Sequence, residues 1–166
     1  MTDFNRSEFI DLFNKMYQPV KNFLYYKTGD IQLAEDITQD AFVKIWEKRK
    51  TIKSSTVKTL LYTVANNLCK NRFEHEQVVL NFANNFHSEE HSNSPDYELE
   101  MKEFHQKLQT ALGRLNEKYR VVFLMNRIDG LTYVQIAQNL NLSVKAVEKR
   151  MKNALHELKK HIDHKI

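Results

Sequence analysis

The chain has few of the residues that break helices or form tight turns. Its 166 residues include three Gly and two Pro, too few for the many tight turns of a strand-rich fold. Long stretches without either residue favour an all-α protein. The length allows one ordinary domain or two small ones, each with a modest core.

Cysteine and long apolar runs are scarce as well. The single cysteine, Cys69, excludes an internal disulfide. No apolar run approaches the roughly 20 residues of a membrane span, and none follows a basic N-terminus as in a signal peptide. We therefore expect a cytoplasmic protein without direct membrane insertion.

The positive charge is modest but unevenly distributed. A net charge of +4 and a pI near 9.0 are compatible with a polyanionic partner. Between residues 74 and 100 acidic side chains meet almost no cation, whereas from Met101 onward Lys and Arg clearly outnumber Asp and Glu. The basic charge is therefore concentrated in the C-terminal part.

Three amphipathic helices are predicted in the first 75 residues. The first follows Ser7 as its N-cap and is expected to kink at Pro19. The second is capped by Asp30 and has an acidic outer face, and the third ends near Arg72. The predicted core stripes are, in order, Phe9, Phe13, Met16, Val20 and Phe23; Ala34, Ile37, Ala41 and Ile45; and Val57, Leu61, Val64 and Leu68.

The acidic middle segment is predicted to be a flexible linker. Ser88, Ser92, Ser94 and Pro95 discourage regular structure there. A short apolar group is too hydrophobic for a purely solvated tether and could pack on a neighbouring element or on a partner. This group consists of Val78, Val79, Leu80, Phe82 and Phe86.

The stretch LTYVQIAQNLNLSVKAVEKRMKNAL, residues 131–155, has the pattern of a helix-turn-helix. Thr132 with Gln135 forms a capping box for a short helix. Asn141 suits the left-handed residue of a sharp turn, and Ser143 caps the helix that follows. Asn116 is expected to cap the preceding helix, which ends at Asp129–Gly130. In the second helix of the motif Val144, Val147, Met151, Leu155 and Leu158 are predicted to point inward.

The outward face of that second helix carries a row of cations with Glu148 and Asn153. Cations can contact phosphates, and Lys, Asn and Glu side chains can read base edges in a major groove. An ordinary helical hairpin with a solvated charged face would show a similar charge run. The two caps, the small Ala137 and the basic outward face coincide in register, which favours DNA binding.

Motifs in both halves of the chain resemble, in order, those of bacterial sigma factors of the extracytoplasmic-function (ECF) group, in the sigma-70 family. LNEKYRVVFLMNRIDGLTYVQIAQNLNLSVKAVEKRMKNALHEL resembles the promoter-binding C-terminal domain, AEDITQDAFVKIWEK the polymerase-binding helix, and TLLYTVANNLCKNRF the helix that engages the minus-ten element. The C-terminal half alone also resembles response-regulator DNA-binding domains. Departures from the family pattern are Asn116 in place of Pro, Asn141 in place of Gly, and Leu60 in place of Trp.

The resemblance implies two small helical domains with separate partners. Sigma domain two (residues 1–75) would bind core RNA polymerase and the minus-ten element, a linker would follow (76–100), and sigma domain four (101–166) would bind the minus-thirty-five element. The implied partners are the β′ clamp helices and β flap of polymerase, promoter DNA and an anti-sigma factor. No cofactor and no metal are implied.

Three sets of residues carry the roles that the resemblance implies. The minus-thirty-five set is Ser143, Lys145, Glu148, Lys149, Arg150, Lys152 and Asn153. The minus-ten set is Lys53, Ser54, Ser55, Tyr62, Thr63, Asn66, Asn67, Lys70 and Arg72. The polymerase set is Asp36, Gln39, Asp40, Val43, Trp46 and Glu47. Two alternatives stay open: Glu148 could only pair with Lys145 or Lys152, and Tyr62 could belong to the core.

The expected function is that of an alternative sigma factor, which is not itself an enzyme. The alternative within DNA binding is a stand-alone dimeric helix-turn-helix regulator that binds a palindrome without polymerase. A helical adaptor that contacts only proteins is a second alternative. A metal-dependent hydrolase using His87 and His91 is the least favoured, because no convincing ligand set accompanies them.

Overall fold

The computed structural model describes residues 4–73, 79–80 and 94–163, which are helical apart from the short connections between the helices. They form seven α-helices, one short 3-10 helix and no β-strand, which confirms the predicted all-α fold. The elements are α1 (Arg6–Thr28), α2 (Ile31–Glu47), η1 (Arg49–Thr51), α3 (Val57–Arg72), α4 (Pro95–Arg114), α5 (Glu117–Arg127), α6 (Tyr133–Leu140) and α7 (Val144–Asp163).

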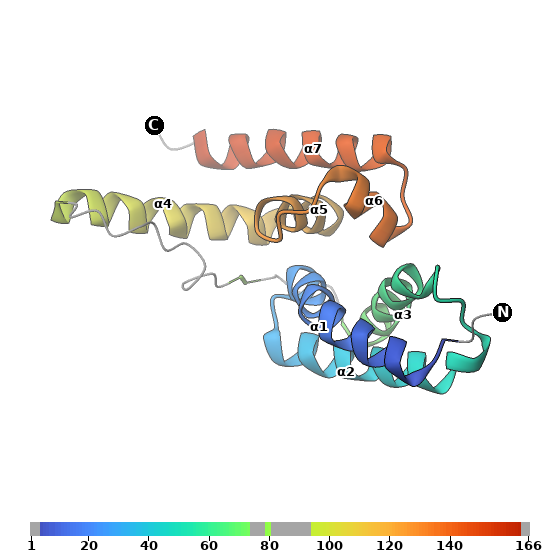
Figure 1. Ribbon diagram of the computed structural model, residues 1–166. Coiled ribbons are helices and arrows are strands. Elements are labelled where there is room, and N and C mark those ends of the chain that lie inside the picture. Colours follow the sequence, from blue (N-terminus) through green and yellow to red (C-terminus); the bar gives the residue numbers. More distant parts are fainter. Residues whose placement is uncertain (1–3, 74–78, 81–93, 164–166) are drawn as a thin grey trace.

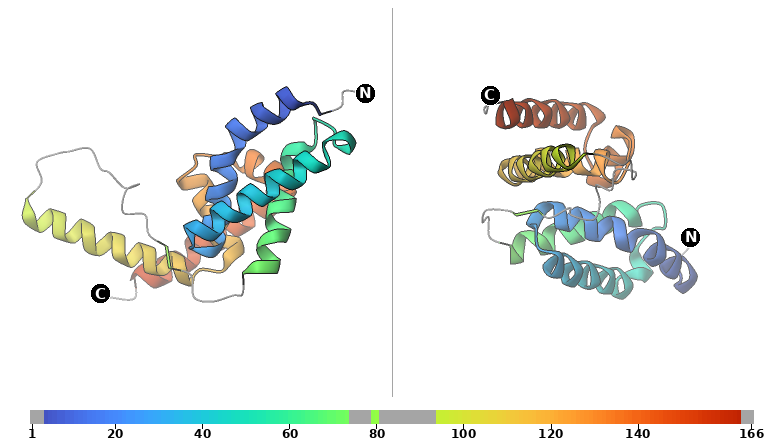
Figure 2. Two further views of the ribbon diagram at one scale, coloured as in Figure 1. Left: turned by 90° about the horizontal axis from the view of Figure 1, so that it is seen from below. Right: turned by 90° about the vertical axis from the view of Figure 1, so that its left-hand side faces the viewer.

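The helices form two stacked bodies. Helices α1, α2 and α3 make the N-terminal domain, and α4 to α7 make the C-terminal domain that lies over it (Figure 1). The views of Figure 2 show the same two bodies, with α5 and α6 next to the N-terminal domain and α7 farthest from it. Helix α1 packs against α5, and α3 packs against α6, so the two domains share one interface.

In the N-terminal domain, local caps fix where the helices begin. Helix α1 is capped by Asn5, and the prediction of Ser7 was wrong: the Asn5 side chain accepts from the Glu8 backbone N–H (3.0 Å), while the Glu8 carboxylate accepts from the Asn5 N–H (2.9 Å). The helix continues through Pro19 to Thr28. Asp30 caps α2 as predicted, through the Leu33 N–H.

Most of the predicted N-terminal core is buried. Ala34, Ile37, Ala41 and Ile45 are each at most 1% exposed. Phe13 is the exception: it is 39% exposed, although its ring contacts those of Tyr17 and Phe42. The predicted stripe of α1 was therefore too wide by one residue.

In the C-terminal domain the helix-turn-helix prediction is confirmed at its two caps and its turn. Thr132 and Gln135 form the capping box, and Asn141 adopts the left-handed conformation with φ of 53°. The Ser143 hydroxyl accepts from the Ala146 N–H at 3.1 Å. Two inward assignments on α7 were wrong: Val144 and Leu155 are 37% and 44% exposed. The buried row at helical spacing is instead Val147, Met151, Ala154 and Leu158.

Helix α4 begins inside the segment that was predicted to be linker. Ser94 caps it by accepting from the Tyr97 N–H, and Pro95 occupies the first turn. Asp96 and Glu98 lie in the same turn, where the helix dipole favours negative charge. Of the apolar group predicted to pack on a neighbour or a partner, Leu80 is buried at 3% exposed, whereas Val79 is 74% exposed. Val78, Phe82 and Phe86 lie outside the described residues.

Candidate nucleic-acid and polymerase interfaces

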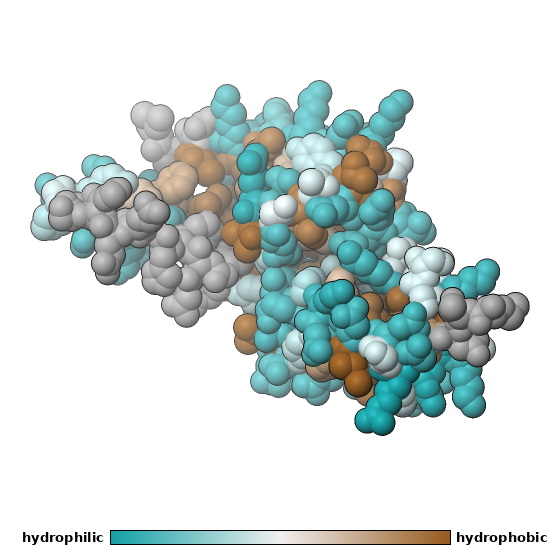
Figure 3. Space-filling model, viewed as in Figure 1, coloured by the Kyte–Doolittle hydropathy of each residue, from teal (hydrophilic) through white to brown (hydrophobic). Residues whose placement is uncertain are grey.

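The minus-thirty-five set lies on α7, the helix most distant from the N-terminal domain (Figure 1). Lys145, Glu148, Lys149 and Lys152 are exposed, and hydrophilic side chains line this outer edge in Figure 3. Among the described residues Glu148 makes no ion pair with Lys145 or Lys152. The row is therefore open to a ligand.

The other members of this set are more constrained. Asn153 is half-buried, and its amide donates to the Tyr119 hydroxyl on α5 at 3.2 Å. Arg150 is half-buried and lines a cavity of about 340 Å³ between the two domains. Ser143 is occupied as the cap of α7. The freely presented groups are therefore the three lysines and Glu148.

The polymerase set lies along the outer face of α2. Asp36, Gln39 and Glu47 are exposed, and Val43 is 54% exposed. Asp40 is paired instead with Arg72 of α3 (Oδ2 to Nη1, 2.6 Å). Trp46 is half-buried, with the Arg49 guanidinium 3.9 Å from its ring centroid.

Two residues of α1 add an apolar component that the sequence analysis missed. Ile10 is 48% exposed and Phe13 is 39% exposed, and Phe13 contacts Phe42 of α2 with ring centroids 5.0 Å apart. We call Ile10, Phe13, Val43 and Trp46 the α1–α2 apolar patch. Grouped apolar side chains rimmed by acids are typical of a protein-binding surface.

The minus-ten set is divided between solvent and the domain interface. Thr63, Asn67 and Lys70 on α3 are exposed. Lys53 and Ser55 in the preceding loop are exposed too, whereas the Ser54 hydroxyl donates to the Glu8 carboxylate at 3.0 Å. Tyr62 and Asn66 face the interface with the C-terminal domain.

Tyr62 and Asn66 both have interior environments. Tyr62 is 2% exposed, packs edge-on against Phe23, and its hydroxyl has no hydrogen-bond partner in the structure. Burial raises the pKa of Tyr62 far above its ordinary value. The Asn66 carbonyl oxygen accepts from the Lys27 ammonium at 2.7 Å. In this arrangement the Tyr62 ring is a core residue.

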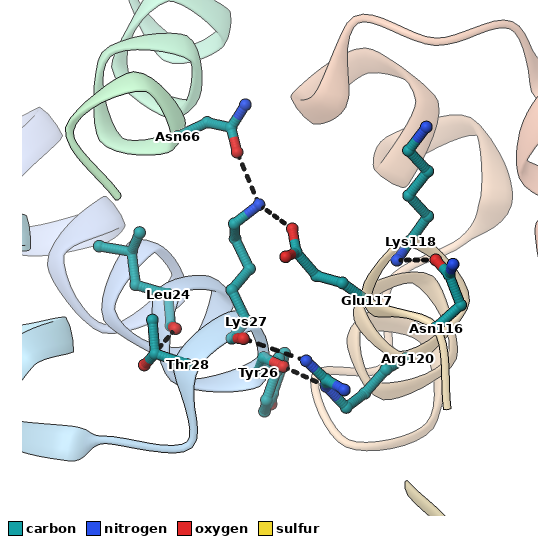
Figure 4. Close-up of polar contacts among 9 residues, drawn as sticks. All are labelled: Leu24, Tyr26, Lys27, Thr28, Asn66, Asn116, Glu117, Lys118 and Arg120. Atoms are coloured by element: carbon teal, nitrogen blue, oxygen red, sulfur yellow. Dashed lines mark hydrogen bonds and ion pairs between the residues drawn. The ribbon is translucent and has the colours of Figure 1, made fainter. Parts of the chain in front are cut away.

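Lys27 and Arg120 connect the domains, and neither was singled out from the sequence. Lys27, near the end of α1, pairs with Glu117 at the start of α5 and also donates to Asn66 (Figure 4). Arg120 donates to the carbonyl oxygens of Tyr26 (2.6 Å) and Lys27 (3.0 Å). Their signal in the sequence is weak: Lys27 follows the apolar run of residues 23–26, and Arg120 precedes that of residues 121–125.

A second polar contact joins α1 to the end of α5. The Asp129 carboxylate accepts from the Tyr26 hydroxyl at 2.6 Å and from the Asn22 amide at 3.1 Å. Burial raises the pKa of Asp129, and the hydrogen bonds from Tyr26 and Asn22 lower it in part. Burial, reinforced by the hydrogen bond to Asp129, also raises the pKa of Tyr26.

Within the described ranges no group of three His, Cys, Asp or Glu side chains could hold a metal ion. His87 and His91 lie outside those ranges. None of the described helices is long and apolar enough to cross a membrane.

Comparison with protein families assigns both halves of the chain. Residues 12–78 match the model of Sigma-70 region 2, and residues 105–158 match that of Sigma-70, region 4. RNA polymerase sigma factor YlaC of Bacillus subtilis is 26% identical over 95% of this chain and 94% of its own length. Ferric citrate uptake sigma factor FecI of Escherichia coli is 27% identical over 89% of this chain and 86% of its own.

Two solved structures share the fold of this chain. CnrH in complex with the cytosolic domain of CnrY has a TM-score of 0.63 at 21% identity, over 98% of this chain and 92% of that chain. The sigma factor RpoE from Bartonella quintana, in complex with the anti-sigma factor NepR, has a TM-score of 0.62 at 16% identity, over 96% and 99%. The three-helix domain and the exposed basic row of the helix-turn-helix thus lie in two matched regions, which follow one another along the chain as regions 2 and 4. The chain belongs to the sigma-70 family, in its group of ECF sigma factors.

Proposed function

We propose that the chain is an alternative sigma factor, which binds core RNA polymerase and directs it to a set of promoters. The observation that carries the proposal is the pairing of two different surfaces in one chain of this family. One is the exposed basic row of α7, and the other is the α1–α2 apolar patch with the acidic residues beside it on α2. A DNA-binding regulator that acts alone needs only the first.

The proposed role of α7 is to read the minus-thirty-five element. Lys145, Lys149 and Lys152 would neutralise phosphates or reach base acceptors in the major groove. Glu148 repels phosphate, so it is useful mainly as an acceptor for a cytosine amino group or as a support for a neighbouring lysine. Glu148 should therefore affect promoter choice more than affinity.

The proposed role of the N-terminal domain is to bind polymerase and the opened minus-ten element. Apolar contact through Val43 and Phe13 would provide affinity for the β′ clamp helices, and the acids around it would speed docking on a basic partner. On α3, Thr63, Asn67 and Lys70 carry hydroxyl, amide and ammonium groups suited to exposed bases and backbone.

Regulation by an anti-sigma factor is part of the proposal. The RpoE relative of similar fold is described in complex with an anti-sigma factor. Such a partner would act by covering surfaces that polymerase or DNA needs. The chain would work by binding, without catalysing a reaction itself.

The test is transcription from a promoter library by purified core polymerase, with and without the protein, followed by sequencing of transcript starts. We expect new starts that share two upstream elements. Lys149→Ala should weaken these starts, whereas Lys159→Ala, an exposed lysine of the same helix outside the set, should not. If the protein neither binds core polymerase nor changes any start, the proposal fails and the stand-alone dimeric regulator replaces it.

A further inference from the structure

The cavity between the two domains is large enough for a small molecule. Its volume is about 340 Å³, and small-molecule sites in proteins span roughly 300–1,000 Å³. Residues of α1 and α3 line it on the N-terminal domain, and residues of α5, α6 and α7 line it on the C-terminal domain. A second cavity of about 520 Å³ shares Lys27, Lys70, Glu117 and Lys118 with it, so the two cavities adjoin.

Three cations on three different helices line the cavity of 340 Å³. They are Lys70 of α3, Lys118 of α5 and Arg150 of α7, and none of them makes an ion pair within the described part of the chain. Like charges around one space repel one another, and the low-dielectric walls of a cavity strengthen the field between them. An anion held among the three cations would remove this repulsion.

The nearby acids do not neutralise these cations. Glu117 is the one acid among the described residues that line the cavity, and it is paired with Lys27 (Figure 4). Asp129, whose charge also acts on Tyr62, does not line the cavity, and its carboxylate accepts two hydrogen bonds from α1. The pair of Lys27 and Glu117 has no net charge, so the cavity keeps the positive charge of its three other cations.

The positions of Lys118 and Arg150 have no explanation in the roles described above. Lys118 lies in the first turn of α5, where the helix dipole disfavours a cation. Arg150 belongs to the minus-thirty-five set, but its half-buried side chain lines the cavity, apart from the exposed lysines of α7. An anion in the cavity would account for both positions.

A buried hydroxyl adds a hydrogen-bond donor to the lining. Tyr62 lines the cavity and is 2% exposed, and its hydroxyl has no hydrogen-bond partner among the described residues. Buried polar groups are nearly always hydrogen-bonded, because an unpaired group loses its hydration without compensation. Burial raises the pKa of Tyr62, so the hydroxyl keeps its proton. It therefore suits a ligand that accepts hydrogen bonds.

The rest of the lining includes an apolar wall. Phe23 and Val121 are 3% and 4% exposed, and Leu140 and Leu142 are half-buried. Lysine and arginine form charge-assisted hydrogen bonds with phosphate, and the arginine fork can hold two phosphate oxygens at once. Three cations match the charge of two or three linked phosphates, and the apolar wall matches an attached nucleoside.

We propose that the interdomain cavity binds a nucleoside di- or triphosphate, with its phosphates among Lys70, Lys118 and Arg150 and a hydrogen bond from the Tyr62 hydroxyl. Lys70 is shared with the minus-ten set, whereas Lys118 and the Tyr62 hydroxyl are used by the ligand alone. The inference does not depend on the proposed function. A failed transcription test would leave it unaffected, because ligand binding is measured on the chain by itself.

The first test is equilibrium dialysis of the full chain against labelled ATP or GTP at physiological ionic strength, where weak surface attraction is screened. We expect both nucleotides to bind. Lys118→Ala and Arg150→Ala should each weaken binding about tenfold, as expected for the loss of one hydrogen bond to a charged group. Lys159→Ala, at an exposed lysine of α7 that does not line the cavity, should leave binding unchanged.

Competition in the same dialysis tests the two parts of the ligand. Pyrophosphate should displace the nucleotide only at higher concentration, and adenosine should not displace it, because the phosphates provide most of the affinity. No binding of either nucleotide, or equal losses in Lys118→Ala and Lys159→Ala, would overturn the proposal. Equal affinity for pyrophosphate and ATP would overturn the assignment of a nucleoside to the apolar wall.

The second test uses Tyr62→Phe, which removes the hydroxyl and keeps the ring. The hydroxyl has no partner among the described residues, so its loss should leave the urea midpoint of unfolding unchanged or raise it. Nucleotide binding should weaken about fivefold, as for the loss of one neutral hydrogen bond. Tyr133→Phe, at a half-buried tyrosine of α6 that does not line the cavity, is the control. Unchanged nucleotide binding in Tyr62→Phe would rule out the proposed contact.

A third measurement separates a free nucleotide from DNA, whose backbone has phosphates of the same kind. A short single strand of thymidines competes with labelled ATP at equal phosphate concentration. We expect little displacement, because a cavity of this volume has no room for several nucleotides. If the strand displaces ATP as well as pyrophosphate does, and Lys118→Ala weakens both equally, the cations belong to a DNA contact and the proposal fails.

Discussion

Among single residues, the Asp129 carboxylate is held in the interface between the domains although burial disfavours its charged form. It is anchored by two donors from α1, Tyr26 and Asn22. Burial nevertheless dominates and raises its pKa above the value of 3.8 for a free side chain. The folded protein therefore binds a proton at Asp129 more readily than the unfolded chain does.

This shift has a definite sign for stability. Between the unfolded and the folded pKa of Asp129 the native state binds more protons, so the contribution of Asp129 to stability is greatest below the unfolded pKa and declines as pH rises through the folded pKa. Asp129→Asn removes this dependence while an amide oxygen can still accept from Tyr26. We expect the variant to gain stability relative to the original protein as pH rises from about 4 toward 7.

Urea unfolding at several pH values measures this difference. Asp11→Asn is the matched control, because Asp11 is exposed and paired only with Lys15 one turn away. If the Asp129→Asn and original curves stay parallel over the whole range, the carboxylate titrates as a solvated group and its anchoring role has been misjudged.

The environment of a single residue could be predicted from the sequence where it is set by neighbours in the same helix. The exposure of Lys145, Lys149 and Lys152 follows from helical periodicity alone. The roles of Lys27 and Arg120 depend on partners some 90 residues away. The sequence does not show whether a cation at the end of an apolar run has its charged tip in solvent or buried against a carbonyl group.

At the scale of elements, the helix-turn-helix is defined by its turn. Asn141 has φ of 53° and ψ of 49°, a conformation that costs a β-branched residue roughly 1–2 kcal/mol. We expect Asn141→Gly to leave the free energy of unfolding nearly unchanged, and Asn141→Val to lower it by about that amount. The Val variant should also weaken binding at the minus-thirty-five element, because α7 would be set at a different angle.

Chemical unfolding of Asn141→Gly and Asn141→Val measures the difference between their free energies of unfolding. Asn14→Val, at an exposed position inside α1, serves as the control, since Asn and Val have similar helix propensities. Equal unfolding free energies for the Gly and Val variants would show that the turn relaxes into another conformation.

The ends of helices could be predicted where a sequence motif is compatible with only one local structure. The Thr132–Gln135 box, the Asp30 cap and the Asn141 turn are local, and the structure has them where the sequence placed them. The Ser94–Pro95 pair is compatible with two local structures, since it can interrupt a helix or begin one. It begins α4, because the acidic residues that follow suit a first turn.

At the scale of the whole molecule, Arg120 should make the two domains unfold together. Arg120→Leu leaves the α1 carbonyls of Tyr26 and Lys27 without their donor in a buried place, a loss of about 1–3 kcal/mol. We expect a single unfolding transition in the original protein and two separate transitions in the variant.

The single tryptophan allows the unfolding of the N-terminal domain to be followed separately. Trp46 lies in α2, so its fluorescence reports on the N-terminal domain, while circular dichroism reports on all helices. The two signals should coincide before the substitution and diverge after it. Thr110→Leu, on the exposed side of α4, is the control. Separate transitions already in the original protein would mean that the interface contributes little to stability.

The division into two helical bodies could be predicted, but their relative position could not. Each domain has its own periodic stripes and its own caps, and these are properties of short segments. The contact of α1 with α5 and of α3 with α6 depends on polar groups that are distant in the sequence. Such contacts leave no periodic pattern to recognise.

The short connection between the domains has a consequence for how strong their contact must be. Leu80 is packed against the folded part and α4 begins at Pro95, so only 14 residues separate two fixed points. A tether of this length holds one domain near the other at an effective concentration on the order of millimolar. An interface too weak to join two separate polypeptides is then occupied most of the time within one, and lengthening the tether alone would weaken it without altering a single contact.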